Sequence, residues 1–130
     1  MVIDSSALLA ILLDEPDAEF YIAAILSDGK RLISAATLVE TSIVIFNKRQ
    51  PTPIAALDAL LARLDIRVVS VDESQAMLAR EAYRDFGRGS GHPARLNFGD
   101  CFAYALAKTS GEPLLFKGDD FGHTDIRIAR

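Results

Sequence analysis

The chain has 130 residues, of which 50% are hydrophobic, and a formal net charge of −4. This length predicts a single domain over residues 1–130 with enough apolar side chains for a buried core. The acidic balance argues against a protein that coats nucleic acid, which needs a broadly basic surface. The apolar stretch ALLAILL is too short to cross a bilayer, and no secretory signal pattern accompanies it. Because Cys101 is the single cysteine, no internal disulfide can form, and we expect a cytoplasmic protein without a membrane anchor.

Segments with strand and helix periodicity alternate along the chain. The expected elements are a strand over 1–4, helices over 5–13 and 14–29, a strand over 31–34, helices over 35–48 and 52–64, a strand over 66–72, a helix over 73–87, a loop over 87–99, a helix over 100–111, and strands over 112–117 and 126–129. This alternation predicts an α/β fold with helices on both faces of a mainly parallel sheet. The strand segments VID and LLF lack polar alternation, as expected for a sheet that is covered on both faces.

Carboxylates recur where predicted strands end or the next helix begins. Asp4 ends the first strand, and Glu40 lies early in the helix after the second. Asp100 begins the last long helix, and Asp119 and Asp120 follow the strand LLFK. Functional sites in open α/β sheets form at the carboxyl ends of the strands, so these acids can face one edge of one sheet.

Each acid also has a purely structural interpretation. Asp4 can cap the following helix, Asp100 can pair with Asn97 in a capping arrangement, and GDDF is a common turn sequence. Glu40 lies on an apolar helix face, from which it can reach the helix rim or pair with a basic side chain. The coincidence of several acids at one sheet edge, rather than any single acid, favours a cation site.

A site with only oxygen ligands suits Mg²⁺ or Mn²⁺. Mg²⁺ binds only one or two carboxylates directly, so some of the acids are expected to act through water. A cation held in this way can activate water and assist the cleavage of a phosphodiester. Zinc is disfavoured because His92 and His123 are the only histidines and no zinc-type spacing is present. We expect Cys101 to be a buried structural thiol.

Taken together, these residues resemble the PIN-domain ribonucleases, most closely the VapC-type toxins of bacterial toxin–antitoxin pairs. The resemblance covers essentially the whole chain and rests on the segments MVIDSSALLAIL, ATLVETSIVI, LNFGDCFAYALA and LLFKGDDF. It implies a three-layer α/β/α PIN fold with a central, mainly parallel sheet. It further implies endonucleolytic cleavage of RNA with Mg²⁺, for which Mn²⁺ can substitute, a small antitoxin that blocks the site, and a homodimer.

The resemblance assigns the catalytic positions to Asp4, Glu40, Asp100 and Asp120. Asp4 and Asp100 are the expected direct metal ligands, with Glu40 and Asp120 in support. Asp119 can contribute in place of Asp120 or together with it. Ser6 matches a hydroxyl position that is often found near the first acid in this family.

A run of basic side chains precedes Asp100 and can be either a solvated helix face or a rim that contacts phosphates. Of this run, Arg84, Arg88 and Arg95 are the candidate RNA contacts. Two other functions stay open: a catalytically inactive PIN-fold binding module, and a phosphoryl-transfer domain of receiver or haloacid type. The second is disfavoured because Asp4-Ser5-Ser6 offers no acidic pair on the first strand.

Overall fold

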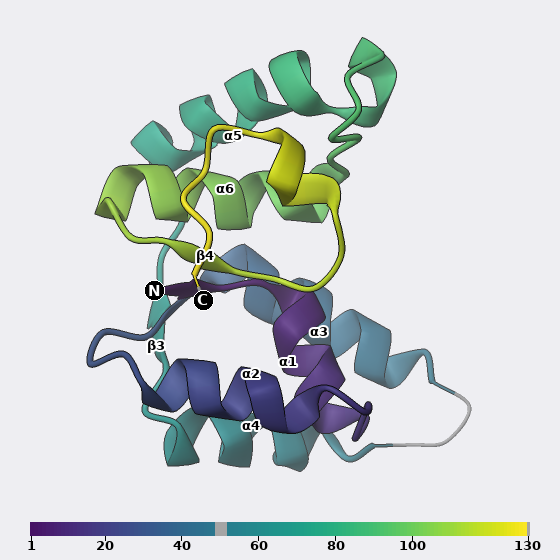
Figure 1. Cartoon of the computed structure of the whole chain (residues 1–130), viewed down its shortest axis with the longest axis vertical. Coiled ribbons are helices and arrows are strands. Elements are labelled where there is room, and N and C mark those ends of the chain that lie inside the picture. Colours follow the sequence, from purple (N-terminus) through teal and green to yellow (C-terminus); the bar gives the residue numbers. More distant parts are fainter. Residues whose placement is uncertain (49–51, 130) are drawn as a thin grey trace.

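The computed structural model describes residues 1–48 and 52–129 (Figure 1). Its sheet has four parallel strands in the order β3-β2-β1-β4. They are β1 Val2–Ile3, β2 Leu32–Ser34, β3 Arg67–Val69 and β4 Leu114–Leu115. The chain runs outward from β1 through β2 and β3 and then returns to the other side of β1 as β4. The order therefore reverses beside β1, which is where ligands bind in open α/β sheets.

The helices are α1 Ser5–Leu12, α2 Ala18–Leu26, α3 Ala35–Phe46, α4 Ile54–Arg63, α5 Glu73–Phe86 and α6 Phe98–Ser110, with short 3₁₀ turns η1 Arg88–Ser90 and η2 Asp120–His123. In Figure 1, α1 to α4 lie on one side of the sheet and α5 and α6 on the other. This arrangement confirms the predicted α/β fold with helices on both faces of a parallel sheet. No helix in residues 1–48 and 52–129 is long and apolar enough to span a membrane.

The two faces of the sheet have separate hydrophobic cores. Ile3 and Leu115 belong to the core under α1 to α4, whereas Val2 and Leu114 belong to the core under α5 and α6. Neighbouring residues of a strand point to opposite faces, so each of these short strands is buried on both sides. This double burial explains why β1 and β4 show no polar alternation.

The segment over 126–129, predicted as a last strand, makes one parallel bridge between Leu114 and Ile128. The Leu114 N–H donates to the Arg127 carbonyl at 2.8 Å, and the Ala129 N–H donates to the Leu114 carbonyl at 2.9 Å. The predicted position beside the sheet is therefore correct, but the pairing ends after these two bonds and no extended strand forms.

Two helix starts involve acids, and the second differs from its predicted position. Asp4 is the N-cap of α1, and its Oδ2 accepts the Ser6 N–H at 3.0 Å. Helix α6 begins at Phe98, earlier than predicted, because Asn97 caps it and closes a capping box with Asp100. The caps therefore hold Asp4 and Asp100 at the first turns of two helices, beside the carboxyl edge of the sheet.

Candidate active site

Four acids from distant parts of the chain come together at this edge. Asp4 directly follows β1, Glu40 lies in α3, Asp100 lies in the first turn of α6, and Asp120 begins η2 after β4. Burial is the main cause that raises the pKa of Asp100 to about 7, and the negative charges of Asp4, Glu40 and Asp120 raise it further. The sequence-predicted set of acids therefore shares one electrostatic environment.

Asp4 is the most deeply buried of the four, with 2% of its surface exposed. Its Oδ2 accepts hydrogen bonds from the Ser6 N–H at 3.0 Å and from the Ser6 hydroxyl at 2.6 Å. Its Oδ1 is also buried but has no hydrogen-bond partner within the described residues. Burial raises the pKa of Asp4, the Ser6 hydrogen bonds lower it, and the charge of Asp120 raises it. The capping interpretation thus accounts for one oxygen of Asp4 and leaves the other unexplained.

Ser6 connects the two strands that flank the reversal in strand order. Its Oγ donates to Asp4 after β1 and accepts the Lys117 backbone N–H at 2.9 Å, just after β4. Gly118 follows with a φ of 100°, a conformation that strongly favours glycine. This turn carries the chain on to Asp120.

Glu40 is half-buried, and its carboxylate packs against the backbone of Gly99 in the first turn of α6. A Cβ atom at position 99 would overlap that carboxylate. Burial is the main cause that raises the pKa of Glu40, and the charge of Asp4 raises it further, while the nearby Ser5 side chain opposes both. In the part of the chain that the structure describes, Glu40 Oε1 is buried without a hydrogen-bond partner. The expected alternative, a pairing with Lys or Arg, is not found among these residues.

Asp100 has a structural role, as its sequence context predicts. Its Oδ2 accepts the Asn97 N–H at 2.9 Å, and its own N–H donates to Asn97 Oδ1 at 2.9 Å. The capping interpretation is therefore confirmed, but it uses Oδ2 and leaves Oδ1 available for another partner. A carboxylate can cap a helix and serve a site at the same time.

The pair Asp119 and Asp120 lies in an exposed turn, as the GDDF sequence predicts. Asp120 is the member whose negative charge raises the pKa of both Asp4 and Asp100. Asp119 precedes the turn, and its carbonyl accepts the Gly122 N–H at 3.0 Å. This geometry favours Asp120 over Asp119 as the acid that faces the site.

The predicted basic rim is only partly assembled. Arg88 lines a cleft between α5 and α6, together with Arg80 from the same basic run. Arg84 instead pairs with the neighbouring Asp85 at 2.9 Å on an exposed surface. Arg95 is exposed with a φ of 51° and does not belong to the cleft lining.

Cys101 and His92 make local structural contacts. Cys101 is buried, its Sγ donates to the Asn97 carbonyl at 3.3 Å, and burial raises its pKa to about 11. This confirms that Cys101 is a structural thiol. His92 Nδ1 accepts the Ala94 N–H at 3.1 Å, inside the loop before α6.

The donor set fits a hydrated hard cation better than a tight cage. Across residues 1–48 and 52–129, no group of three or more His, Cys, Asp or Glu side chains forms a ready-made metal cage. Asp4 Oδ1 and Glu40 Oε1 are nonetheless buried acceptors without partners in this same part of the chain. Because a buried carboxylate oxygen without a partner is costly, a cation with its waters would relieve both atoms. Mg²⁺ keeps several waters and needs few direct carboxylates.

Two residues that bear on the site went unrecognised in the sequence. Gly99 provides the space that Glu40 occupies, and Phe98 exposes 78% of its surface beside the α5–α6 cleft. A glycine within the first turn of a helix is a weak local signal for such close packing. The local sequence does not predict that Phe98 is exposed, because this exposure depends on the early start of α6.

Comparison with known proteins identifies the family of the chain. The family model described as PIN domain matches residues 1–127. Ribonuclease VapC28 of Mycobacterium tuberculosis is 53% identical over 129 residues, which is 99% of this chain and 97% of the relative. The structure of M. tuberculosis VapC20, titled a Sarcin-Ricin loop cleaving toxin, has a TM-score of 0.72 at 21% identity, over 96% of this chain and 95% of the other. A toxin–antitoxin complex from Klebsiella pneumoniae has a TM-score of 0.66 at 13% identity, over 92% and 88%.

The two solved structures are too distant in sequence to show more than the fold. The family match and the 53% identical relative, each spanning nearly the whole chain, establish the family itself. The resemblance to VapC-type toxins is thereby confirmed. The chain belongs to the PIN-domain family and, within it, to the VapC ribonucleases.

Proposed function

We propose that this chain is a divalent-metal-dependent endoribonuclease and the toxin of a toxin–antitoxin pair. The observation that carries the proposal is that four acids from separate segments act on one another through their charges, and that two of them, Asp4 and Glu40, each have a buried oxygen without a partner among the described residues. A structural explanation would satisfy these oxygens with a hydrogen bond or an ion pair. A cation site explains them directly.

In this proposal Asp4 and Asp100 would hold Mg²⁺, and Glu40 and Asp120 would support it through water. Mn²⁺, which also prefers oxygen ligands, can substitute. When bound, the ion supplies Lewis-acid chemistry that activates water and neutralises charge on the phosphodiester and its leaving oxygen. Ser6 positions Asp4 by occupying Oδ2, so that Oδ1 stays directed to the site.

Cation binding requires that the carboxyl groups of the site are ionised. Asp100 holds its proton up to about pH 7, so this carboxyl group has to release it before the site is fully charged. Glu40 and Asp120, in support, can accept hydrogen bonds from water near the scissile bond. The arginines outside the acidic centre offset its negative charge and so reduce its repulsion of an RNA backbone.

Two protein partners belong to the proposal. Val39, Ile43 and Phe46 form a stripe along one face of α3 and expose 57%, 51% and 67% of their surfaces. A contiguous exposed apolar stripe favours an interface, and we assign it to a second copy of this chain. The second partner is a small antitoxin that covers the acidic site, in line with the toxin–antitoxin complex among the structural neighbours. The protein is expected to act in the cytoplasm, where RNA is abundant and Cys101 stays reduced.

Cleavage of total RNA tests this function. The purified protein is incubated with Mg²⁺, Mn²⁺ or a chelator, beside an Asp100→Asn variant. Asp72→Asn is the matched control, because Asp72 only caps α5 by accepting the Gln75 N–H at 2.8 Å and asparagine caps equally well. We expect discrete fragments that require metal and Asp100 but not Asp72.

Two results would contradict the proposal. Normal cleavage by a folded Asp100→Asn protein would remove Asp100 from the chemistry. A folded wild-type protein that neither cleaves RNA nor binds Mn²⁺ would identify the chain as a catalytically inactive PIN-fold binding module.

A further inference from the structure

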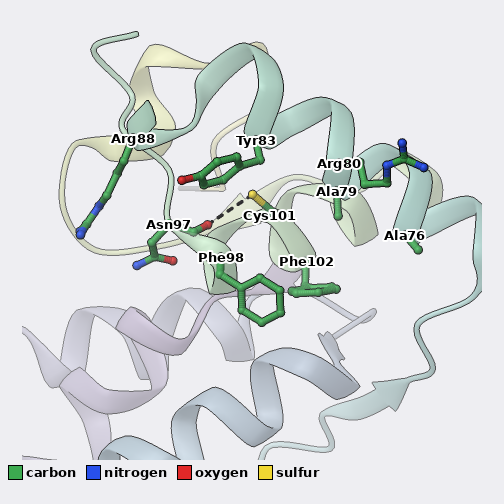
Figure 2. A pocket seen from close by; sticks show the side chains of 9 residues that line it. All are labelled: Ala76, Ala79, Arg80, Tyr83, Arg88, Asn97, Phe98, Cys101 and Phe102. Atoms are coloured by element: carbon green, nitrogen blue, oxygen red, sulfur yellow. Dashed lines mark hydrogen bonds between the residues drawn. The ribbon is translucent and has the colours of Figure 1, made fainter. Parts of the chain in front are cut away.

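An apolar cleft of about 610 Å³ lies between α5 and α6 (Figure 2). Its walls include the aromatic rings of Tyr83, Phe98 and Phe102 and the methyl group of Ala79. The volume lies within the range of about 300–1,000 Å³ that is typical of pockets for small organic groups. The proposed ribonuclease chemistry at the acids does not by itself require such a cleft.

The aromatic rings of the cleft are unusually accessible. Phe98 exposes 78% of its surface and Tyr83 exposes 45%. Phe98 meets Phe102 edge to face, with ring centroids 4.9 Å apart. Exposed aromatic faces are the platforms on which single-stranded nucleic acids stack their bases.

Positive charge stands at both ends of this aromatic surface. Figure 2 shows Arg80 and Arg88 at opposite ends of the cleft, with the aromatic side chains between them. Among the described residues neither guanidinium pairs with a carboxylate, in contrast to Arg84, which pairs with Asp85. A guanidinium group without a carboxylate partner is available to bind phosphate.

The first turn of α6 connects the wall of the cleft to the acidic centre. Asn97 lines the cleft, and its backbone N–H donates to Asp100 Oδ2 at 2.9 Å. Cys101 forms part of the same wall, one residue beyond Asp100, and donates to the Asn97 carbonyl (Figure 2). The wall of the cleft and a proposed metal ligand therefore share the first turn of α6.

We propose that the α5–α6 cleft binds one unstacked base of single-stranded RNA, next to the phosphodiester that is cleaved at the acidic centre. Phe98 and Tyr83 provide the stacking surface, and Arg80 and Arg88 contact the phosphates on either side of that base. An amphipathic helix of a protein is the other occupant that an apolar groove suits. The cleft instead has a cation at each end and an aromatic surface between them. This order matches a nucleic-acid strand, in which charged phosphates alternate with flat bases.

This inference rests on the proposed ribonuclease function, so its test measures binding without cleavage. The probe is a mixed-sequence single-stranded RNA oligonucleotide that carries a fluorescent adenine analogue whose emission falls on stacking. Titration is done in EDTA with wild-type protein, Phe98→Ala and Phe98→Tyr. The matched control is Phe20→Ala, because Phe20 exposes 58% of its surface on α2, outside the cleft.

We expect the wild-type protein to quench the probe and Phe98→Ala to bind it at least about 5-fold more weakly, the loss that removal of one stacked base typically causes. Phe98→Tyr keeps a ring and should restore both affinity and quenching. Phe20→Ala should match the wild type. Arg88→Gln should reduce affinity and make it less sensitive to salt, because one phosphate contact is lost.

Three results would overturn the inference. Equal binding by Phe98→Ala and the wild type would remove Phe98 from the contact. Failure of the wild type to bind the probe would exclude a base site in the cleft. A Phe98→Ala variant that loses self-association in sedimentation but binds RNA normally would assign the cleft to a protein interface. Metal-dependent cleavage of total RNA, measured in parallel, shows whether the ribonuclease proposal stands when the cleft proposal falls.

Discussion

The hydroxyl group of Ser6 donates a hydrogen bond to Asp4 Oδ2 at 2.6 Å and accepts one from the Lys117 backbone N–H at 2.9 Å. Asp4 directly follows β1, and Lys117 follows β4, the strand beside it. One side chain therefore fixes the orientation of a buried carboxylate and the path of the chain toward Asp120. Ser6 therefore helps to position Asp120, although the two residues lie far apart in the sequence.

Replacing Ser6 with alanine should weaken metal binding and cleavage while the fold is retained. Loss of a hydrogen-bond partner that orients a metal ligand typically costs about 10- to 100-fold in metal affinity or activity. The buried Asp4 carboxylate would also lose the hydroxyl group that donates a hydrogen bond to it, at a cost of about 1–3 kcal/mol in the free energy of unfolding. Mn²⁺ titration by calorimetry and thermal unfolding measure the two effects.

Ser42→Ala is the matched control for this prediction, because the Ser42 hydroxyl donates only to the Leu38 carbonyl within α3, at 2.8 Å. Ser6→Thr keeps a hydroxyl group and should recover much of the metal affinity. A Ser6→Ala protein with the metal affinity of the Ser42→Ala protein would show that Asp4 needs no such support.

Gly99→Ala should displace Glu40 without unfolding the protein. A Cβ at this position overlaps the Glu40 carboxylate, which is the free end of a flexible side chain and can move away. We therefore expect a small change in melting temperature but at least a 10-fold loss of cleavage, since a misplaced carboxylate no longer supports the site. Thermal unfolding and cleavage of total RNA are the two measurements.

Gly29→Ala serves as the control for Gly99→Ala, because an added Cβ at Gly29 meets no atom within 4 Å. It should leave both cleavage and stability near those of the wild type. Full activity in a folded Gly99→Ala protein would show that the position of Glu40 is unimportant for the reaction.

The metal-free protein should lose stability as the pH rises from about 4 to 7. Asp100 keeps its proton in the folded state up to about pH 7, whereas its ordinary pKa is 3.8. Between these values the folded state binds more protons than the unfolded chain, so the free energy of unfolding falls with rising pH and levels off above pH 7. Burial raises the pKa of Asp4 and Glu40 in the same direction.

Thermal unfolding in EDTA across this pH range tests the prediction. Asp100→Asn cannot ionise at this position and should show a shallower decline than the wild type. Added Mn²⁺ should raise the melting temperature more at pH 7.5 than at pH 5, because binding requires ionised carboxylates. Identical pH profiles for Asp100→Asn and the wild type would contradict the assignment of this titration to Asp100.

The positions of the acids could be predicted from sequence because each one stands at a strand end or helix start, and parallel strands bring such ends to one edge. The same local signals predicted the cap at Asn97, which the structure confirms. What could not be predicted depends on contacts between distant segments. Gly99 faces Glu40 only once α3 and α6 pack together. Arg88 lines the cleft from the turn after α5, whereas Arg84 pairs with Asp85 outside the cleft.

The exposed apolar stripe of α3 should mediate self-association. Ile43 is its central residue and exposes 51% of its surface, so a lysine there introduces charge without disturbing the core. Sedimentation velocity of Ile43→Lys should give a monomer at concentrations where the wild type is a dimer, because burying an unpaired charge in an apolar interface is costly.

Leu26→Lys on α2, with 53% exposure, is the matched control and should remain dimeric. If Ile43→Lys sediments like Leu26→Lys, the stripe is not the dimer interface, and a monomeric wild type would exclude the homodimer itself.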